Sequence, residues 1–218
     1  APIAEDFIVG TANGMCRYRD DIRVVVEGAE FADYFWPAME QLVECSHDYW
    51  RTKGQFSANV VIRLASGGYI QGGLYHSQNI EATLATLPGI RVVMPCFADD
   101  AVGLMRTAIR SRGVTMYLEP KFLYNYRPTS APLSPDNVVV PFGKARIRRE
   151  GTDVTVVTFG TTVHWSLQAA ETLAAEGISV EVIDLRSIIP WDRELVLERV
   201  RRTGRCVVAH EDKLLGGF

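Results

Sequence analysis

A glycine-rich stretch, SGGYIQGGLYHSQ (66–78), holds the side chain best placed for chemistry. It follows an apolar, β-branched run at 59–65, and His76 begins a predicted helix at 76–87. Glycine-rich turns let the backbone approach a ligand closely, and an imidazole at such a point can exchange a proton with that ligand. A histidine at a helix start can also simply bond to a neighbour. The glycine-rich segment and the helix start together favour a functional His76.

Two other side chains, Glu5 and Tyr34, indicate a functional site only when they are considered together with His76. Glu5 lies in PIAED, before a helix-like apolar stretch, where a lone carboxylate usually complements the helix dipole. Tyr34, in FADYF, would by default be a core aromatic residue. His164 and His210 are predicted to be structural.

Several common site motifs do not occur. Neither GxxxxGK[ST] nor GxGxxG is present, which disfavours a P-loop and a dinucleotide site. The four cysteines form no CxxC pair, so a zinc site is disfavoured and a reducing compartment is indicated. Cys96 and Cys206 lie in or beside β-branched runs and are expected to be buried thiols.

Strand-like and helix-like segments alternate along the chain. Short β-branched runs predict strands, and apolar residues at helical spacing, such as Phe35, Met39 and Leu42, predict helices. Such alternation implies an α/β fold with mostly parallel sheets flanked by helices. The predicted strands are 22–28, 59–65, 90–96, 114–120, 153–160, 178–186 and 205–211, and the predicted helices are 32–46, 76–87, 99–111, 162–177 and 191–203.

A proline-rich segment divides the chain. Five prolines fall within 120–142 without a clear period, which predicts an extended linker. We therefore predict two domains, 1–127 and 143–218, joined by a linker at 128–142. The chain has no initiator Met and stops at LLGGF. We accordingly expect a piece of a longer protein, truncated before the first domain and after the second.

Composition excludes several classes of protein. The 218 residues are 47% hydrophobic and 22% charged, which is ordinary globular composition and not that of a disordered chain. A net charge of −3 gives no basic excess for nucleic-acid binding. No apolar stretch approaches the roughly 18 residues of a membrane span, and the first residues do not look like a signal peptide.

Seven segments together resemble one protein family: PIAED, EFADYFWPAMEQ, SGGYIQGGLYHSQNIEATLATLPGIRVVMP, LEPKFLYN, GTDVTVVTFGTTVH, EVIDLRSIIPWD and TGRCVVAHEDKLLGGF. They are similar to the β subunit of the thiamin diphosphate-dependent 2-oxo acid dehydrogenases, the decarboxylating first component of those complexes. They also resemble chains in which α and β halves are fused. FADY, LYHSQ, LEPKFLY and IIPWD look closer to branched-chain than to pyruvate members. The resemblance implies a transketolase-like pyrimidine-binding domain followed by a transketolase C-terminal-like domain.

The resemblance gives roles to five residues. Glu5 matches the catalytic, cofactor-binding Glu that shares a proton with the aminopyrimidine ring of thiamin diphosphate. Tyr34 matches the aromatic residue that stacks on the pyrimidine ring. Ile3 is expected to line the same pocket, and Glu30 to border it. His76 matches a catalytic His near the thiazolium end, suited to proton transfer while the acyl group passes to lipoamide.

The family's diphosphate and Mg²⁺ site is expected in a partner chain. The α-type half grips them through a GDG motif, which this sequence lacks. Gln71 replaces a His that some branched-chain relatives carry on the same loop. Ser111 and Gly113 stand where some relatives have acidic or amide side chains near a structural alkali cation, so no metal is assigned to this chain.

The resemblance also implies partners and a location. The partners are an α-type half, a second β chain in an α2β2 assembly, and a lipoyl acyltransferase component, with no nucleic acid and no membrane. The location is the cytoplasm in a bacterium or the mitochondrial matrix in a eukaryote. Two alternatives stay open: a pyruvate- or acetoin-specific member of the same group, and a non-catalytic assembly subunit. The joint presence of Glu5, Tyr34 and His76 argues against the second.

Overall fold

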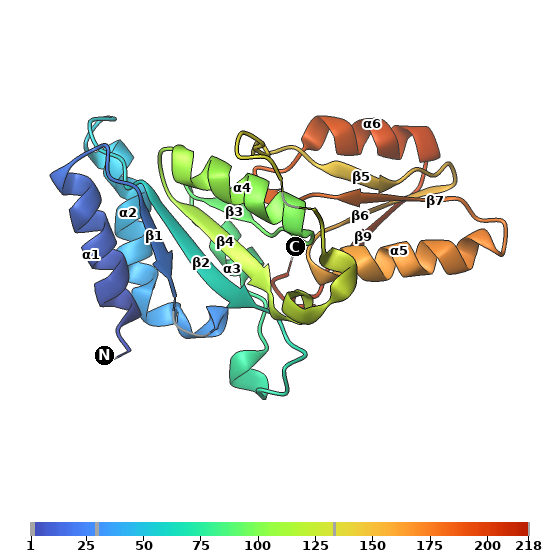
Figure 1. Cartoon of the computed structure of the whole chain (residues 1–218), viewed down its shortest axis with the longest axis horizontal. Coiled ribbons are helices and arrows are strands. Elements are labelled where there is room, and N and C mark those ends of the chain that lie inside the picture. Colours follow the sequence, from blue (N-terminus) through green and yellow to red (C-terminus); the bar gives the residue numbers. More distant parts are fainter. Residues whose placement is uncertain (1–2, 29–30, 133, 218) are drawn as a thin grey trace.

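Two β-sheets, each flanked by helices, make up the molecule (Figure 1). The structure is a computed structural model that describes residues 3–28, 31–132 and 134–217. The first sheet has five strands and the second has four. Most of the strand pairs are parallel, so the predicted two-domain α/β class is confirmed.

The first sheet has the strand order β1-β2-β4-β3-β8. Its first four strands run parallel, and β8 joins antiparallel to β3. Parallel neighbours need long crossovers, which the intervening helices supply. The strands are β1 (Val24–Glu27), β2 (Val60–Ser66), β4 (Thr115–Pro120), β3 (Arg91–Val93) and β8 (Ser187–Ile189).

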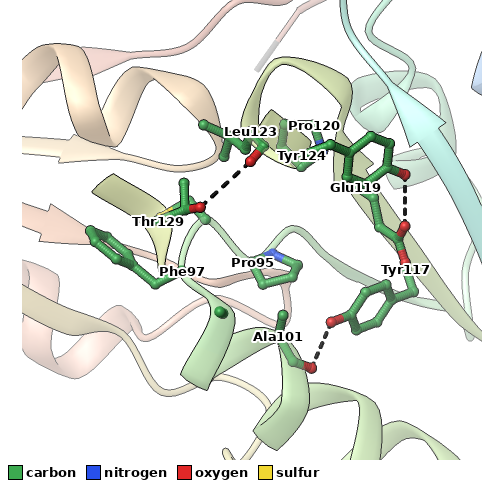
Figure 2. A pocket seen from close by; sticks show the side chains of 11 residues that line it. Pro95, Phe97, Ala101, Tyr117, Glu119, Pro120, Leu123, Tyr124 and Thr129 are labelled. Carbon is green, nitrogen blue, oxygen red and sulfur yellow. Dashed lines mark hydrogen bonds between the residues drawn. The ribbon is translucent and has the colours of Figure 1, made fainter. Parts of the chain in front are cut away.

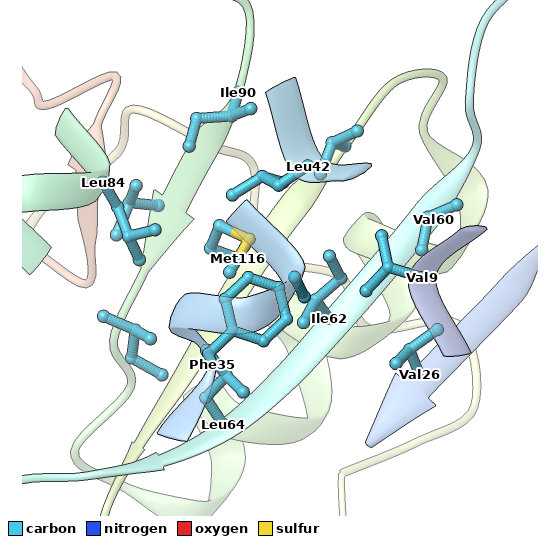
Figure 3. Packing of buried hydrophobic residues seen from close by; sticks show 14 of the residues in the cluster. Val9, Val26, Phe35, Leu42, Val60, Ile62, Leu64, Leu84, Ile90 and Met116 are labelled. Atoms are coloured by element: carbon cyan, nitrogen blue, oxygen red, sulfur yellow. The ribbon is translucent and has the colours of Figure 1, made fainter. Parts of the chain in front are cut away.

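Helices cover both faces of the first sheet. Successive side chains of a strand point to opposite faces, so Ile62 and Leu64 of β2 pack on one face and Val61 packs with Leu104 on the other. Figure 3 shows the larger cluster around Phe35, Leu42 and Met116. The larger cluster includes residues of α1 (Glu5–Tyr18), α2 (Met39–Arg51) and α3 (Glu81–Ala85), and the other includes residues of α4 (Ala98–Arg110).

The second sheet repeats this plan with one helix on each face. Val182 packs with Ala170 of α5, whereas its neighbour Ile183 packs with Val196 of α6. In Figure 1 the two helices lie on opposite sides of the sheet. The strand order is β5 (Arg146–Arg149), β7 (Val180–Asp184), β6 (Val154–Thr158) and β9 (Cys206–Ala209), with α5 (Thr161–Ala174) and α6 (Arg193–Thr203).

A buried ion network joins the two sheets beside α4. Arg148 of β5 donates to Asp184 of β7 at 2.7 Å and also binds Asp100 of α4. Arg186 donates to Asp100 at 2.7 Å, and the Cys96 thiol donates to Asp184 at 3.1 Å. Burial, reinforced by the Asp184 carboxylate, raises the pKa of the Cys96 thiol well above its ordinary value. The network and β8 fix residues 184–189 against the first sheet.

Three expectations need correction. The helix predicted at 76–87 is a short α3 that begins only at Glu81, and His76 instead ends the 3-10 helix η3 (Leu74–His76). The proline-rich segment 120–142, predicted to be extended, contains two further 3-10 helices, η4 (Lys121–Asn125) and η5 (Arg127–Thr129). Cys206 is exposed on β9, which is an edge strand of the second sheet. The domain boundaries at 127/128 and 142/143 stay a prediction.

Candidate functional site

The predicted site residues lie at one edge of the first sheet. Tyr34 ends η1 (Ala32–Tyr34), which follows β1, and His76 ends η3, which follows β2. The segment after β4 begins with Lys121. Because β1, β2 and β4 are parallel neighbours, their carboxyl ends meet at the same edge. Figure 1 shows the start of α1, where Glu5 lies, at this edge as well.

Glu5 is a buried carboxylate at the first position of α1. Its side chain is 5% exposed, and its Oε1 has no hydrogen-bond partner in the part of the chain that the structure describes. The helix N-terminus partly compensates its negative charge. A buried polar atom without a hydrogen bond nevertheless costs stability. Glu5 Oε1 therefore has capacity for a hydrogen bond that the described residues do not use.

Tyr34 and His76 are in contact. Their ring centroids are 5.0 Å apart with the planes tilted by 54°, and the Phe31 ring stacks on His76 at 4.4 Å. Tyr34 is 44% exposed, so much of the phenol ring is free to contact another flat group. The buried Nδ1 of His76 has no hydrogen-bond partner among the described residues. The structure thus places the His76 imidazole beside the exposed Tyr34 ring.

The glycine-rich loop allows His76 to lie where it does. A Cβ on Gly72 would come within 2.6 Å of the His76 Cβ, so a larger residue there would displace the imidazole. Tyr69 and Gln71 have φ values of +71° and +61°, which are unfavourable for residues with side chains. Strained backbone of this kind concentrates at functional sites. The close approach of this loop to a ligand, predicted from the glycines, stays a prediction.

The other two predicted residues have different outcomes. Ile3 is 74% exposed and lies just before α1. Glu30 lies outside the described residues. The roles of Ile3, Glu5, Glu30, Tyr34 and His76 therefore stay predictions.

Sequence reasoning missed two buried charges beside the ring pair. Asp33, next to Tyr34, is 7% exposed, and neither carboxylate oxygen has a hydrogen-bond partner among residues 3–28, 31–132 and 134–217. Lys121 is 6% exposed and donates through Nζ to the His76 carbonyl at 2.6 Å. Burial lowers the pKa of Lys121, and the Asp33 charge opposes that shift. The LEPKFLYN motif contains Lys121, but nothing in its composition marks that lysine as buried.

A separate apolar cavity lies at the carboxyl end of β3 and β4, near the start of α4. Its volume is about 250 Å³, and Figure 2 shows its lining. The Tyr117 hydroxyl donates to the Ala101 carbonyl, and the Tyr124 hydroxyl donates to Glu119, each at 2.7 Å. None of the predicted site residues lines this cavity.

Metal and membrane features are not found in the described parts of the chain. No group of three or more His, Cys, Asp or Glu side chains there is arranged to hold a metal ion. No described helix combines the length and apolar character that crossing a bilayer requires.

Comparisons with known proteins support the resemblance. The chain is 39% identical over 218 residues to 2-oxoisovalerate dehydrogenase subunit beta of Bacillus subtilis, covering 100% of this chain and 65% of that protein. It is 37% identical over 211 residues to pyruvate dehydrogenase E1 component subunit beta of Acholeplasma laidlawii, covering 96% and 63% respectively. The chain thus spans slightly less than two thirds of these curated relatives. Several eukaryotic relatives are named as mitochondrial proteins.

The fold comparison and the family models agree with each other. A solved chain described as split gene transketolase, inactive beta4 tetramer, superposes with a TM-score of 0.63 at 23% identity, covering 100% of this chain and 82% of that one, which shows a shared fold. The model of the transketolase pyrimidine binding domain matches residues 1–127, and the model of the transketolase C-terminal domain matches residues 143–218. The chain therefore belongs to the transketolase family, and its relatives include β subunits of 2-oxo acid dehydrogenases.

Proposed function

We propose that this chain is the β-type half of the decarboxylating component of a 2-oxo acid dehydrogenase complex. The reaction is thiamin diphosphate-dependent oxidative decarboxylation, with branched-chain 2-oxo acids favoured and acyl transfer to lipoamide. The observation that carries the proposal is the unsatisfied Glu5 carboxylate at the same sheet edge as the Tyr34–His76 ring pair. The similarity to a 2-oxoisovalerate dehydrogenase β subunit supports the substrate class.

The residues at this edge fit the pyrimidine end of thiamin diphosphate. The unsatisfied Oε1 of Glu5 can share a proton with a ring nitrogen, and the exposed Tyr34 ring can stack on the pyrimidine. Ile3 and Glu30 are proposed to border the same pocket. The bound cofactor supplies the electron sink for loss of CO₂. The α-type partner would hold its diphosphate and Mg²⁺, because this sequence has no GDG motif.

His76 is proposed to serve the later step, transfer of the acyl group to lipoamide. Its Nδ1 has no hydrogen-bond partner in the described chain, so this atom can accept or give a proton. The stacked Phe31 ring and the bond from Lys121 to the His76 carbonyl restrict the imidazole to one orientation. A fixed imidazole reduces the entropy lost when the reacting groups meet.

The proposed assembly contains more than this chain. Its partners are the α-type half, a second β chain in an α2β2 assembly and a lipoyl acyltransferase component. Residues 1–127 would form the pyrimidine-binding domain and 143–218 the C-terminal-like domain, joined by 128–142. The location would be the cytoplasm of a bacterium or the matrix of a mitochondrion. Similarity to a pyruvate dehydrogenase β subunit favours pyruvate as the second candidate substrate.

Glu5→Gln in the full-length protein assembled with its α-type partner tests the proposal. Gln keeps the size of the side chain but cannot share a proton, so we expect turnover to fall by on the order of 100-fold. Asp6→Asn is the matched control, because Asp6 is the exposed neighbour in the same helical turn, and it should stay within about twofold. Near-normal decarboxylation by Glu5→Gln, measured with an artificial electron acceptor, would contradict the assignment.

A further inference from the structure

Lys121 is a buried cation at the candidate site. It is the first residue of η4, directly after β4, and it is only 6% exposed. Removing an ammonium group from water is unfavourable unless the protein replaces the lost hydration. Three groups around Lys121 supply that replacement, and each belongs to the sheet edge that carries Tyr34 and His76.

The three groups come from two different segments. The Lys121 Nζ donates to the His76 carbonyl at 2.6 Å and lies 4.3 Å from the centroid of the Phe31 ring, a cation–π contact. The Asp33 carboxylate favours the charged form of Lys121 electrostatically. One ammonium group therefore connects the end of β4 to η3 and to the segment that carries Tyr34.

The His76 carbonyl that Lys121 contacts lies in a segment that does not continue as a helix to α3. In a continuous helix the His76 carbonyl would accept the N–H of Ile80. Here it accepts the Lys121 ammonium instead, and Ile80 adopts a non-helical conformation before α3. The His76 ring stays stacked on Phe31, within 5.0 Å of the Tyr34 ring centroid.

We propose that Lys121 is a positioning residue that holds the His76 imidazole against Phe31 and Tyr34 in the arrangement needed for acyl transfer. The inference rests on the proposed function, because acyl transfer is the step assigned to His76. Lys121 acts through the His76 backbone and the Phe31 ring. Its loss should therefore affect the His76-dependent step more than decarboxylation.

The kinetic test uses the full-length protein assembled with its α-type partner. Lys121→Met removes the charge and keeps an unbranched side chain. We expect acyl transfer to a lipoyl domain to fall at least about tenfold more than decarboxylation with an artificial acceptor. In a His76→Ala background the same substitution should change acyl transfer by less than about twofold, because residues that act together are non-additive. Independent, multiplying losses would overturn the proposal.

Lys213→Met is the matched control. Lys213 also donates to a carbonyl of this region, that of Asn79 at 2.9 Å, but its side chain is half exposed. We expect both reactions to stay within about twofold of wild type. An effect on acyl transfer as large as that of Lys121→Met would show a general requirement for an anchored loop and would overturn the specific role of Lys121.

Hydrogen–deuterium exchange of the full-length protein tests positioning without any activity. Lys121→Met should accelerate exchange at 73–77, whereas Lys213→Met should not. Unchanged exchange at 73–77 in Lys121→Met overturns the proposal. If the wild-type protein is inactive on every 2-oxo acid, only the proposed function is overturned. If Lys121→Met does not fold, Lys121→Gln is measured in the same way. Failure of both to fold contradicts a positioning role, because such a role leaves the core intact.

Discussion

Glu81 allows a direct measurement of how one buried carboxyl group affects the pH dependence of folding. It is the first residue of α3, is 1% exposed, and its Oε2 has no hydrogen-bond partner within the described chain. Burial raises its pKa from the ordinary value of 4.5 to about 7, reinforced by the charges of Asp212 and Glu211 and opposed by Lys213.

The direction of the effect follows from the raised pKa. Below about pH 4.5 Glu81 is protonated in both the folded and the unfolded chain and contributes no difference. Between about pH 4.5 and 7 the unfolded chain releases the proton while the folded chain keeps it, so the free energy of unfolding falls as the pH rises. A shift from 4.5 to about 7 corresponds to about 3 kcal/mol, which is fully lost above pH 7.

Urea unfolding from about pH 4 to 8.5 measures this loss. The quantity to follow is the difference between the free energies of unfolding of wild type and Glu81→Gln. This difference should fall by about 3 kcal/mol between about pH 4.5 and 7 and stay constant below and above that range. Glu171→Gln is the control, because Glu171 is exposed on α5, and its difference curve should have no step of this size. A constant difference for Glu81→Gln between about pH 4.5 and 7 would refute the reasoning.

Two further predictions concern His76 and the ion network between the sheets. His76→Ala in the assembled enzyme should lower acyl transfer to a lipoyl domain at least about tenfold more than decarboxylation, a difference of roughly 1.4 kcal/mol in barrier; equal losses would return His76 to a structural role. Arg148→Met should lower the free energy of unfolding by about 3–5 kcal/mol, because it leaves the buried Asp184 carboxylate without its guanidinium partner. Urea unfolding checks this, with the exposed Arg201→Met as control, and a loss below about 1 kcal/mol would contradict it.

The main parallel strands and most helices could be predicted because their residues carry strong local patterns. β-branched runs such as 59–65 and the apolar spacing of 99–111 agree with β2 and α4 within one residue at either end. Two strands were not predictable in this way. β5 contains three arginines, and β8 is only three residues long and pairs with β3 far away in the sequence. Both depend on tertiary contacts that leave no local periodicity.

The candidate site was predictable only in part. The residue types and the glycine-rich turn pointed to His76, and the family resemblance added Glu5 and Tyr34. The predicted helix start at His76 was wrong, because His76 ends the 3-10 helix η3 and α3 begins only at Glu81. Lysines are mostly exposed, so the burial of Lys121 could be seen only from its tertiary contacts with His76 and Phe31.

The central claim is that this chain supplies one half of a divided active site. The most direct test mixes the full-length protein with its α-type partner, thiamin diphosphate and Mg²⁺. Decarboxylation is then measured with 2-oxoisovalerate and with pyruvate, using an artificial electron acceptor. We expect activity only when both chains are present, with higher kcat/KM for the branched substrate. Activity of the β-type protein alone, or no activity of the assembled pair on any 2-oxo acid, would contradict the account.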